Sequence, residues 1–322
     1  MIERIIHLFA ERPNEFISGE QLSEQLQCSR TAVWKHISAL RNLGYEFEAA
    51  PRKGYRLIRR PDKLSESVLT AGLRTTTFGR SIRLFDRIGS TQEAARELAE
   101  QGEPEGTVVI AEQQTAGKGR MGRSWHSPYG KGLWMTLLLR PRIPIHFAPQ
   151  LTLMSAVAVC RAIRQCAAVP AAIKWPNDLL IGGKKVCGIL LESSAEDERL
   201  RYVLVGIGTS VNLTVEDFPD ELRDVATSLR IAAGREQNRA ELFHAILYEF
   251  ERWYNLYQEN GFDPVRRAWE ALAVSLGGRI RARTPHGYVE GTARSIDDSG
   301  ALAVETEDGE IVKLYSADFE TS

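Results

Sequence analysis

Cysteine is scarce in this chain, and its few cysteines form no recognisable pair. Cys28, Cys160, Cys166 and Cys187 make no C-x-x-C and stand beside no histidine at the spacing of zinc ligands. This excludes a disulfide scaffold and a zinc-binding module, so we expect isolated, reduced thiols. No metal ligands are predicted.

Long hydrophobic runs are also missing. No apolar stretch approaches the roughly 18 residues that span a bilayer. The start, Met1-Ile2-Glu3-Arg4, has acid and base where a signal peptide needs a basic and then an apolar region. With 43% hydrophobic and 26% charged residues in 322, the composition is typical of two or three globular domains. We expect a cytoplasmic protein with no membrane partner.

A strong net charge is absent overall, at −1, but the first 60 residues differ from the rest. They hold ten Lys/Arg against seven Asp/Glu, whereas the remainder is net −4. Within them, segments 29–43 and 51–60 contain basic residues and no acid. Two acid-free basic segments in one small domain predict a surface that faces phosphates.

Three helices are predicted near the N-terminus. Apolar residues at i, i+3, i+4 and i+7 begin at Ile2. Ser18 and Gln21 have the spacing of a capping box for a second helix. Ser29 caps a third, whose buried stripe begins at Val33.

The second and third helices are separated by a short turn, and the outer side of the third is basic. This arrangement is typical of a helix-turn-helix, whose second helix enters the major groove of DNA. Residues 45–50 and 54–58 read as two strands joined by a basic turn, which would form a wing. The alternative is a small helical domain that makes protein contacts. The predicted DNA-binding residues are Ser29, Arg30, Thr31, Trp34, Lys35, Ser38, Arg41, Arg52 and Lys53.

After Pro61 strands alternate with long helices. Helices are predicted at 91–101 and 147–168. The pattern favours a mixed sheet with helices on one face. The predicted strands are 82–88, 107–112, 133–139, 172–175, 186–192 and 202–211.

A glycine-rich segment at 117–122 contains a literal G-x-G-x-x-G. The dinucleotide fingerprint requires a helix directly after the glycines, and Pro128 with its neighbours prevents one. No G-x-x-x-x-G-K-[ST] occurs either. With Lys118, Arg120 and Arg123, the segment still suits an anion. It is predicted to be an unpaired, flexible lid over a phosphate-bearing ligand; the alternative is a mobile basic surface loop.

Three further features indicate a pocket. Lys185 opens an otherwise apolar strand, so its ammonium is expected at the end of the sheet beside a cavity. Gly206 and Gly208 leave a strand without side chains, as where a ligand or backbone packs closely. Ser90 and Thr91 stand at the predicted start of a helix, where capping alone could also explain them.

The C-terminal part combines helices with short strands. Helices are predicted at 238–260 and 264–274. Turn signals then separate four alternating runs, which predict a small β-barrel. These runs are 279–283, 288–295, 302–305 and 311–314.

Taken together, the motifs Q-T-A-G-K-G-R-x-G-R-x-W, K-W-P-N-D, K-x-x-G-I-L and G-I-G resemble those of the biotin protein ligase family. With the winged helix in front, the chain resembles the bifunctional ligase–repressors over nearly its whole length. The resemblance implies an α/β (α+β) fold in three domains. These are a winged helix-turn-helix (1–62), a class II-synthetase-like ligase domain with a mixed sheet (63–275) and an SH3-like β-barrel (276–322).

The resemblance also implies a two-step reaction. Biotin and ATP, with Mg²⁺ held mainly by the phosphates, give biotinyl-5′-AMP and pyrophosphate. A lysine of the biotin carboxyl carrier domain of a carboxylase then displaces AMP. Binding of biotinyl-AMP would promote a homodimer that binds operator DNA and represses transcription.

Residue roles follow by position in the family motifs. Lys185 and Arg120 are the expected catalytic residues, where developing negative charge needs fixed cations. Lys118, Gln92, Thr209 and Ser210 depart from common family residues. The expected biotin-binding residues are Ser90, Thr91, Gln92, Gln114, Lys118, Gly119, Arg120, Lys185, Gly188 and Gly206; the expected nucleotide-binding residues are Gly117, Arg123, Trp125, Asn177 and Asp178.

Two other functions stay open on the sequence. A repressor without enzymatic activity would use the large domain only to sense a ligand, although the presence of Lys185 speaks against it. A lipoate ligase would share the fold, although the K-W-P-N-D segment and the glycine-rich segment favour biotin.

Overall fold

The computed structural model describes residues 2–12, 14–42, 45–59, 63–284, 287–315 and 317–320. The chain divides into two compact units, Met1–Lys63 and Leu64–Ser322, and each has its own hydrophobic core. Arg60, the last residue of the predicted basic segment 51–60, lies outside the described residues.

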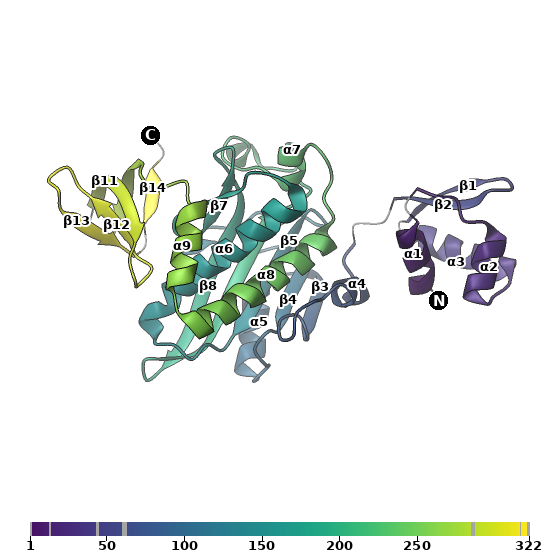
Figure 1. The fold of residues 1–322 in the computed structure, drawn as a ribbon, viewed down its shortest axis with the longest axis horizontal. Helices are drawn as coiled ribbons and strands as arrows, with labels where there is room; N and C mark the ends of the chain where they lie inside the picture. The colour runs from purple at the N-terminus through teal and green to yellow at the C-terminus, as the bar shows by residue number, and fades with distance from the viewer. Residues whose placement is uncertain are drawn as a thin grey trace. The chain divides into compact units, whose positions relative to one another are not determined.

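The first unit contains three helices and a hairpin. Its predicted capping box is confirmed: the Ser18 side chain accepts from the Gln21 N–H, and the Gln21 side chain accepts from the Ser18 N–H. The apolar sides of the helices meet around Ile5, Leu22 and Ile37. The elements are α1 (Ile2–Glu11), α2 (Gly19–Leu26), α3 (Arg30–Asn42), β1 (Glu46–Ala50) and β2 (Gly54–Arg59) (Figure 1).

The hairpin is joined to the start of α2 by main-chain contacts. Ile17 and Tyr55 exchange backbone hydrogen bonds of 2.8 and 2.9 Å. Gly54 has φ +100°, and a Cβ there would lie 2.1 Å from the carbonyl oxygen of Ile17. Only glycine permits both the backbone conformation and this close approach.

The second unit is built on a seven-stranded sheet. β3 and β4 are parallel, and all other neighbours are antiparallel. The predicted mixed sheet is therefore confirmed, with β7 as a strand that the sequence did not predict. In spatial order the strands are β3 (Ile82–Ile88), β4 (Val108–Gln114), β5 (Gly132–Leu139), β9 (Arg199–Ser210), β8 (Lys184–Glu196), β7 (Asp178–Ile181) and β6 (Ala172–Lys174).

Helices cover both faces of this sheet, so the expectation of helices on one face was wrong. On β5, Leu137 packs into the core under α6 and α8, whereas Leu138 packs with Ala95 and Ala99 of α5. Because successive side chains of a strand point to opposite faces, both faces are apolar and need a cover. The helices are α5 (Thr91–Glu100) on one face and α6 (Ala148–Ala167), α8 (Arg239–Asn260) and α9 (Asp263–Leu272) on the other side (Figure 1).

The strand register aligns residues from four strands in one row. Lys174 on β6 pairs with Asp178 on β7, Asp178 with Gly188 on β8, and Gly188 with Gly208 on β9. The next row on the same face pairs Leu190 with Gly206 and Gly206 with Thr136. These two rows lie on the α5 side of the sheet.

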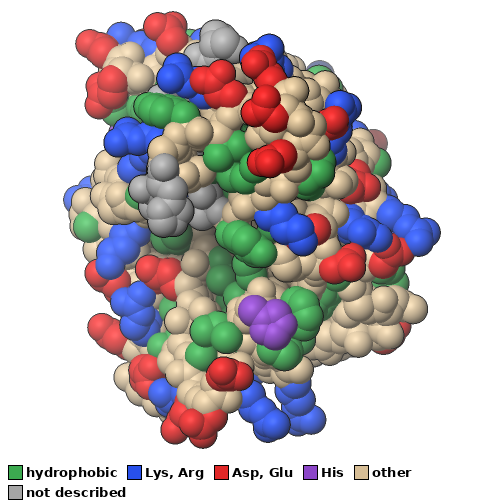
Figure 2. Space-filling view, turned by 90° about the vertical axis from the view of Figure 1, so that its left-hand side faces the viewer, with side chains coloured by type: hydrophobic (Ala, Val, Ile, Leu, Met, Phe, Trp, Pro, Cys, Tyr) green, Lys and Arg blue, Asp and Glu red, His purple; other side chains and the backbone are tan. Residues whose placement is uncertain are grey.

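Within the same unit, the C-terminal residues form a second sheet, which is five-stranded and antiparallel. The side chain of Gln150 donates to the Asp298 carbonyl, and the Ile296 N–H donates to Glu270. Ion pairs such as Arg294–Glu305 and Lys313–Asp297 balance its surface charges, and Figure 2 shows blue and red side chains interspersed over this side. The strands in order are β13 (Ile311–Leu314), β12 (Leu302–Glu305), β11 (Gly287–Ile296), β10 (Arg279–Thr284) and β14 (Asp318–Glu320).

Short elements complete the description: α4 (Glu66–Ala71), α7 (Leu229–Ala233) and the single turns η1 (Arg120–Gly122), η2 (Ile145–Phe147) and η3 (Asp220–Leu222). Among the described residues, none of the helices is both long and apolar enough to cross a membrane.

Candidate active site

A cavity of about 600 Å³ lies on the α5 side of the seven-stranded sheet. The two residue rows form its floor, α5 begins at one end, and the glycine-rich segment and residues 218–226 lie around it. All the residues predicted to bind biotin line this cavity, and so do Arg123, Trp125, Asn177 and Asp178. Gly117 does not line the cavity but lies beside Gln114, which does: a Cβ on Gly117 would lie 3.0 Å from Nε2 of Gln114.

Glycines in the floor make room for two side chains. A Cβ on Gly206 would lie 2.7 Å from Oε1 of Gln92. A Cβ on Gly208 would lie 2.4 Å from Nε1 of Trp125, and one on Gly188 would lie 2.9 Å from the same ring. The indole of Trp125 therefore occupies space that side chains at Gly188 and Gly208 would fill, so only glycine fits at these two positions.

Amide and hydroxyl groups cluster at the α5 end of the cavity. Thr91 donates its backbone N–H to Oε1 of Gln114 at 2.9 Å, and its hydroxyl lies 2.9 Å from that of Thr136. The Thr136 hydroxyl donates to Oε1 of Gln92, and Ser90 caps α5 by accepting from the Gln92 N–H. Thr91 and Gln92 are each 3% exposed, so this polar cluster is held rigidly in the interior.

The glycine-rich segment is folded on itself, so the expectation that it is unpaired was wrong, while its role as a lid stays a prediction. The Gly119 N–H donates to the Arg123 carbonyl at 2.7 Å, and the Trp125 N–H to the Gly117 carbonyl at 2.8 Å. Lys118 and Ser124 form an isolated bridge between these two bonds. The segment is a short hairpin-like loop whose tip is η1.

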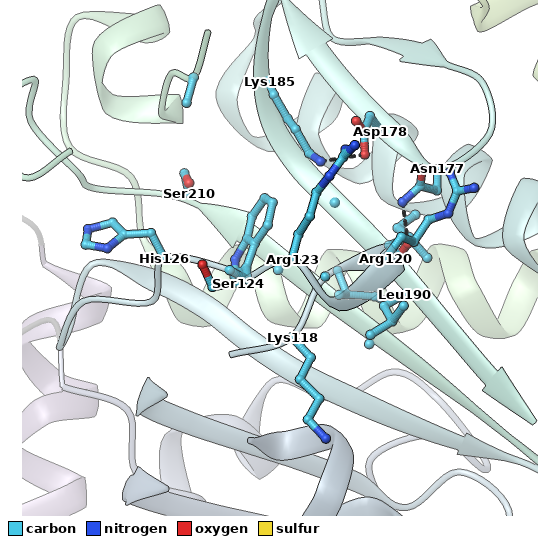
Figure 3. Close-up of a pocket in the computed structure, with 18 of the residues that line it drawn as sticks. Lys118, Arg120, Arg123, Ser124, His126, Asn177, Asp178, Lys185, Leu190 and Ser210 are labelled. Atoms are coloured by element: carbon cyan, nitrogen blue, oxygen red, sulfur yellow. Dashed lines mark hydrogen bonds and ion pairs between the residues drawn. The ribbon is translucent and has the colours of Figure 1, made fainter. Parts of the chain in front are cut away.

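Lys118 points away from the other cations of the cavity. Its ammonium lies 2.6 Å from a carboxylate oxygen of Glu93 on α5, and Figure 3 shows it directed to the opposite side from Lys185. The hydrogen bond and charge of Lys118 hold the pKa of Glu93 below its ordinary value. The ammonium therefore ties the loop to α5.

The remaining polar groups converge at the other end. Nζ of Lys185 lies 2.7 Å from Oδ1 of Asp178 and 5.1 Å from the centre of the Trp125 ring. Arg120 donates to Oδ1 of Asn177 at 3.0 Å, and Figure 3 shows Arg123 directed toward Asp178. Lys185 and Arg123 thus lie at the Asp178 carboxylate, with Arg120 held by Asn177 beside them, and the excess of positive charge suits an anionic ligand.

Residues 218–226 border the cavity without any motif that could have predicted them. The Lys185 N–H donates to the Val225 carbonyl and the Thr227 N–H to the Lys185 carbonyl, both at 2.8 Å. His126, which the sequence also did not single out, lies 2.8 Å from the Asp217 carbonyl oxygen. The backbone at Lys185 is therefore fixed from both sides.

Two departures from the common family residues fall on different faces of β9. Ser210 lines the cavity, whereas Thr209 points behind it and donates to Sγ of Cys187. Burial raises the pKa of the Cys187 thiol to about 12. This thiol therefore stays neutral, and it does not line the cavity.

The first unit carries the second candidate site. On α3, Trp34 is 56% exposed and Lys35 is exposed beside it, on the side opposite buried Val33 and Ile37. Two of the predicted cations also have protein partners: Arg30 pairs with Glu20 at 3.1 Å, and Arg41 donates to the Phe47 carbonyl at 3.0 Å. Ser29 accepts from the Ala32 N–H, while Thr31, Arg52 and Lys53 are exposed and Ser38 is half-buried.

The donor groups suit a metal ion that arrives with phosphates. Among the described residues, no cluster of three or more His, Cys, Asp or Glu could hold an ion alone. Asp178 and Asp224 are carboxylates that line the cavity. Mg²⁺ bound mainly by phosphate oxygens needs no more protein ligands than these.

Comparisons with known proteins agree over the whole chain. Residues 84–210 match the biotin/lipoate A/B protein ligase family, 2–56 an HTH domain, and 275–321 the biotin protein ligase C terminal domain. The chain is 53% identical to the bifunctional ligase/repressor BirA of Bacillus subtilis over 98% of this chain and 97% of that protein. It is 30% identical to the BirA of Escherichia coli over 97% and 94%.

Among solved structures, the biotin protein ligase from Aquifex aeolicus in complex with biotin and ATP matches with a TM-score of 0.65 and 29% identity. The match covers 75% of this chain and 98% of that one. The chain therefore belongs to the family of bifunctional biotin ligases and repressors.

Proposed function

We propose that this chain joins biotin to an acceptor protein through biotinyl-5′-AMP and also represses transcription in response to biotin. The observation that carries the proposal is the cavity itself. A rigid amide and hydroxyl cluster lies at one end, the cations Lys185, Arg120 and Arg123 line the other, and a floor of glycines joins the two. A neutral ring system with an acidic tail is the ligand that such a cavity suits.

In the first step, a carboxylate oxygen of biotin attacks the α-phosphorus of ATP. The bond from that phosphorus to the bridging oxygen breaks, and pyrophosphate leaves. Lys185 and Arg120 reduce the repulsion between the two anions and stabilise the charge on the phosphoryl oxygens. Lys185 meets this charge by exchanging its ion pair with Asp178 for the ligand.

In the second step, the amine of an acceptor lysine attacks the biotinyl carbonyl. An amide bond forms, AMP leaves and the amine loses a proton. Lys185 stabilises the oxyanion. The acceptor is the biotin carboxyl carrier domain of a carboxylase.

Ring binding is assigned to the α5 end. Thr91, Gln92 and Gln114 supply donors and acceptors for the urea group of biotin, and Gly206 gives the bicyclic ring its space. Trp125 provides an aromatic face for adenine. ATP brings Mg²⁺, which neutralises phosphate charge.

Biotin-dependent exchange between ATP and labelled pyrophosphate tests the first step. The wild type should exchange, and Lys185→Ala should lower the rate about a hundredfold or more, since it removes a charge aimed at the transition state. Lys184→Ala is the matched control, because Lys184 instead donates to the Arg223 carbonyl. Absence of exchange in the wild type would favour a repressor that only senses a ligand, and exchange with lipoate in place of biotin would favour a lipoate ligase.

For the second function, α3 is assigned to the major groove of operator DNA, with Trp34 and Lys35 toward the bases and phosphates. The basic hairpin is the wing. Biotinyl-AMP binding promotes a homodimer, so that two winged helices meet a palindromic operator. Both activities are assigned to the cytoplasm.

A further inference from the structure

The outer face of α3 carries an indole that the first unit itself does not use. Trp34, the fifth residue of the helix, is 56% exposed and lies away from the buried stripe of Val33 and Ile37. Among the residues that the structure describes, its side chain has no hydrogen bond and no ring contact. Neither packing nor a polar partner within the unit therefore accounts for an indole at this position.

The arginines of this helix have partners within the unit. Arg41 donates to the Phe47 carbonyl at 3.0 Å, and Arg30 pairs with Glu20 at 3.1 Å. Arginine is the usual reader of guanine, because its guanidinium donates two parallel hydrogen bonds to O6 and N7. With both guanidinium groups of α3 engaged by protein groups, the face around Trp34 does not favour recognition of a G·C pair.

Charge decides what kind of molecule covers the indole. Segments 29–43 and 51–60 contain no acidic residue, and Lys35, next to Trp34 on α3, is exposed. An apolar protein partner would have to bury these cations without a counter-charge, whereas DNA supplies phosphates on both sides of its major groove. The acid-free surface therefore favours DNA as the occupant.

The chemistry of an indole matches one group at the base edges of the major groove. Thymine alone presents an apolar group there, its C5 methyl. The other groups are hydrogen-bond donors and acceptors, to which an indole offers a single N–H. The wide apolar face of an indole instead suits a methyl group, because their contact removes both from water.

We infer that Trp34 contacts a thymine methyl group in each half of the operator and so selects an A·T pair at that position. The inference rests on the proposed function, which puts α3 in the major groove. The first turns of a recognition helix reach the base edges, and Trp34 lies in that part of α3. Lys35 meets a phosphate, which fixes the register of the helix but carries no sequence information.

Removal of the methyl group from the DNA tests this contact. The wild type, with biotin and MgATP, selects a palindromic duplex from random sequences. Each symmetric pair of thymines is then replaced by deoxyuridine, which lacks only the C5 methyl. One such replacement should lower the wild-type affinity about tenfold, as for two lost methyl contacts. Trp34→Ala should bind the thymine and deoxyuridine duplexes equally, because the group that senses the methyl is gone.

Matched variants separate this contact from others. Lys35→Ala should weaken the binding of both duplexes alike and keep the ratio of the two affinities. Ile58→Ala, at the exposed apolar side chain of β2, should keep the ratio as well, and so should Trp34→Leu, which retains an apolar group. Each variant should keep the wild-type rate of pyrophosphate exchange and the wild-type thermal melt, since all three positions are exposed.

A wild type that selects a sequence but binds every deoxyuridine duplex as tightly would overturn the inference, and so would a ratio that persists in Trp34→Ala. Loss of the ratio in Trp34→Leu as well as in Trp34→Ala would overturn it in favour of a structural role for the indole. A wild type that exchanges pyrophosphate but selects no sequence would contradict the proposed repressor activity itself, which separates that failure from failure of the inference.

Discussion

At the scale of single residues, Gly208 sets the depth of the cavity floor. A Cβ there would lie 2.4 Å from Nε1 and 2.6 Å from Cε2 of Trp125. Both atoms belong to a rigid ring, so Gly208→Ala must displace the indole. We expect the KM for MgATP to rise about tenfold, equivalent to about 1.4 kcal/mol, with a small loss of thermal stability. Steady-state exchange kinetics and a thermal melt measure the two effects.

Gly19→Ala is the control for this substitution. A Cβ on Gly19 meets nothing within 4 Å, so neither ligand binding nor the melt should worsen. Nucleotide affinity that is unchanged in Gly208→Ala would show that the position of Trp125 does not matter for binding.

Motifs identify residues better than they identify partners. Lys118, predicted to bind biotin, does line the cavity, but its ammonium is paired with Glu93, a residue of no motif. Phe319 also lines the cavity but gives no signal in the sequence, because its position depends on β14 packing next to Trp175, far away along the chain. Such contacts depend on the tertiary structure and not on local spacing.

At the scale of elements, Glu251 ties α8 to the segment that precedes β3. Its carboxylate accepts the N–H groups of Thr76, Thr77 and Phe78 at 2.7 to 2.9 Å, and the side chain is 8% exposed. Glu251→Gln replaces one acceptor oxygen by a donor and removes the charge. The free energy of unfolding should fall by about 2 kcal/mol at pH 7, measured by urea denaturation.

The loss should depend on pH. Burial alone would raise the pKa of Glu251, but the three backbone N–H donors outweigh burial and hold that pKa below the ordinary value of 4.5. A carboxyl group whose pKa is lower in the folded state stabilises the fold at pH values above its unfolded-state pKa. This stabilisation is lost as the pH falls through the folded-state pKa. The difference from the wild type should therefore shrink below about pH 4.5. Glu259→Gln, exposed on the same helix, should show no difference at either pH.

Element prediction succeeded where hydrophobic patterns are long. Strand Ile82–Ile88 has its predicted bounds, and α8, predicted at 238–260, spans Arg239–Asn260. β7 and β14, with four and three residues, were missed because so short a run holds too little periodicity. The prediction of helices on one face failed because amphipathicity of a helix does not say which face of the sheet it covers.

At the scale of the whole molecule, two units with separate cores must be linked by something other than a shared interior. The cavity lies in the second unit, and the helix proposed to face DNA is α3 of the first. The homodimer proposed to form on adenylate binding would supply the link by mass action, because two weakly binding units held together bind a palindrome with much higher effective concentration.

Sedimentation velocity and operator binding test this coupling together. With biotin and MgATP the wild type should sediment as a dimer and bind a palindromic operator, whereas without them it should be a monomer of weak affinity. Lys35→Ala should leave ligase activity and dimerisation unchanged. It should weaken operator binding about tenfold, because Lys35 is an exposed cation of α3. The slope of the logarithm of the binding constant against the logarithm of the salt concentration should also fall by about one in magnitude.

The same change of charge elsewhere in the unit separates specific contact from general attraction. Arg12→Ala removes one positive charge outside α3 and the hairpin, so it should alter operator affinity much less than Lys35→Ala. Equal effects of the two variants would mean that the unit attracts DNA only by its net charge. A wild type that exchanges pyrophosphate but stays monomeric with biotin and MgATP would support the ligase activity and contradict the dimer as the link. Adenylate binding then could not raise the affinity for a palindrome through assembly.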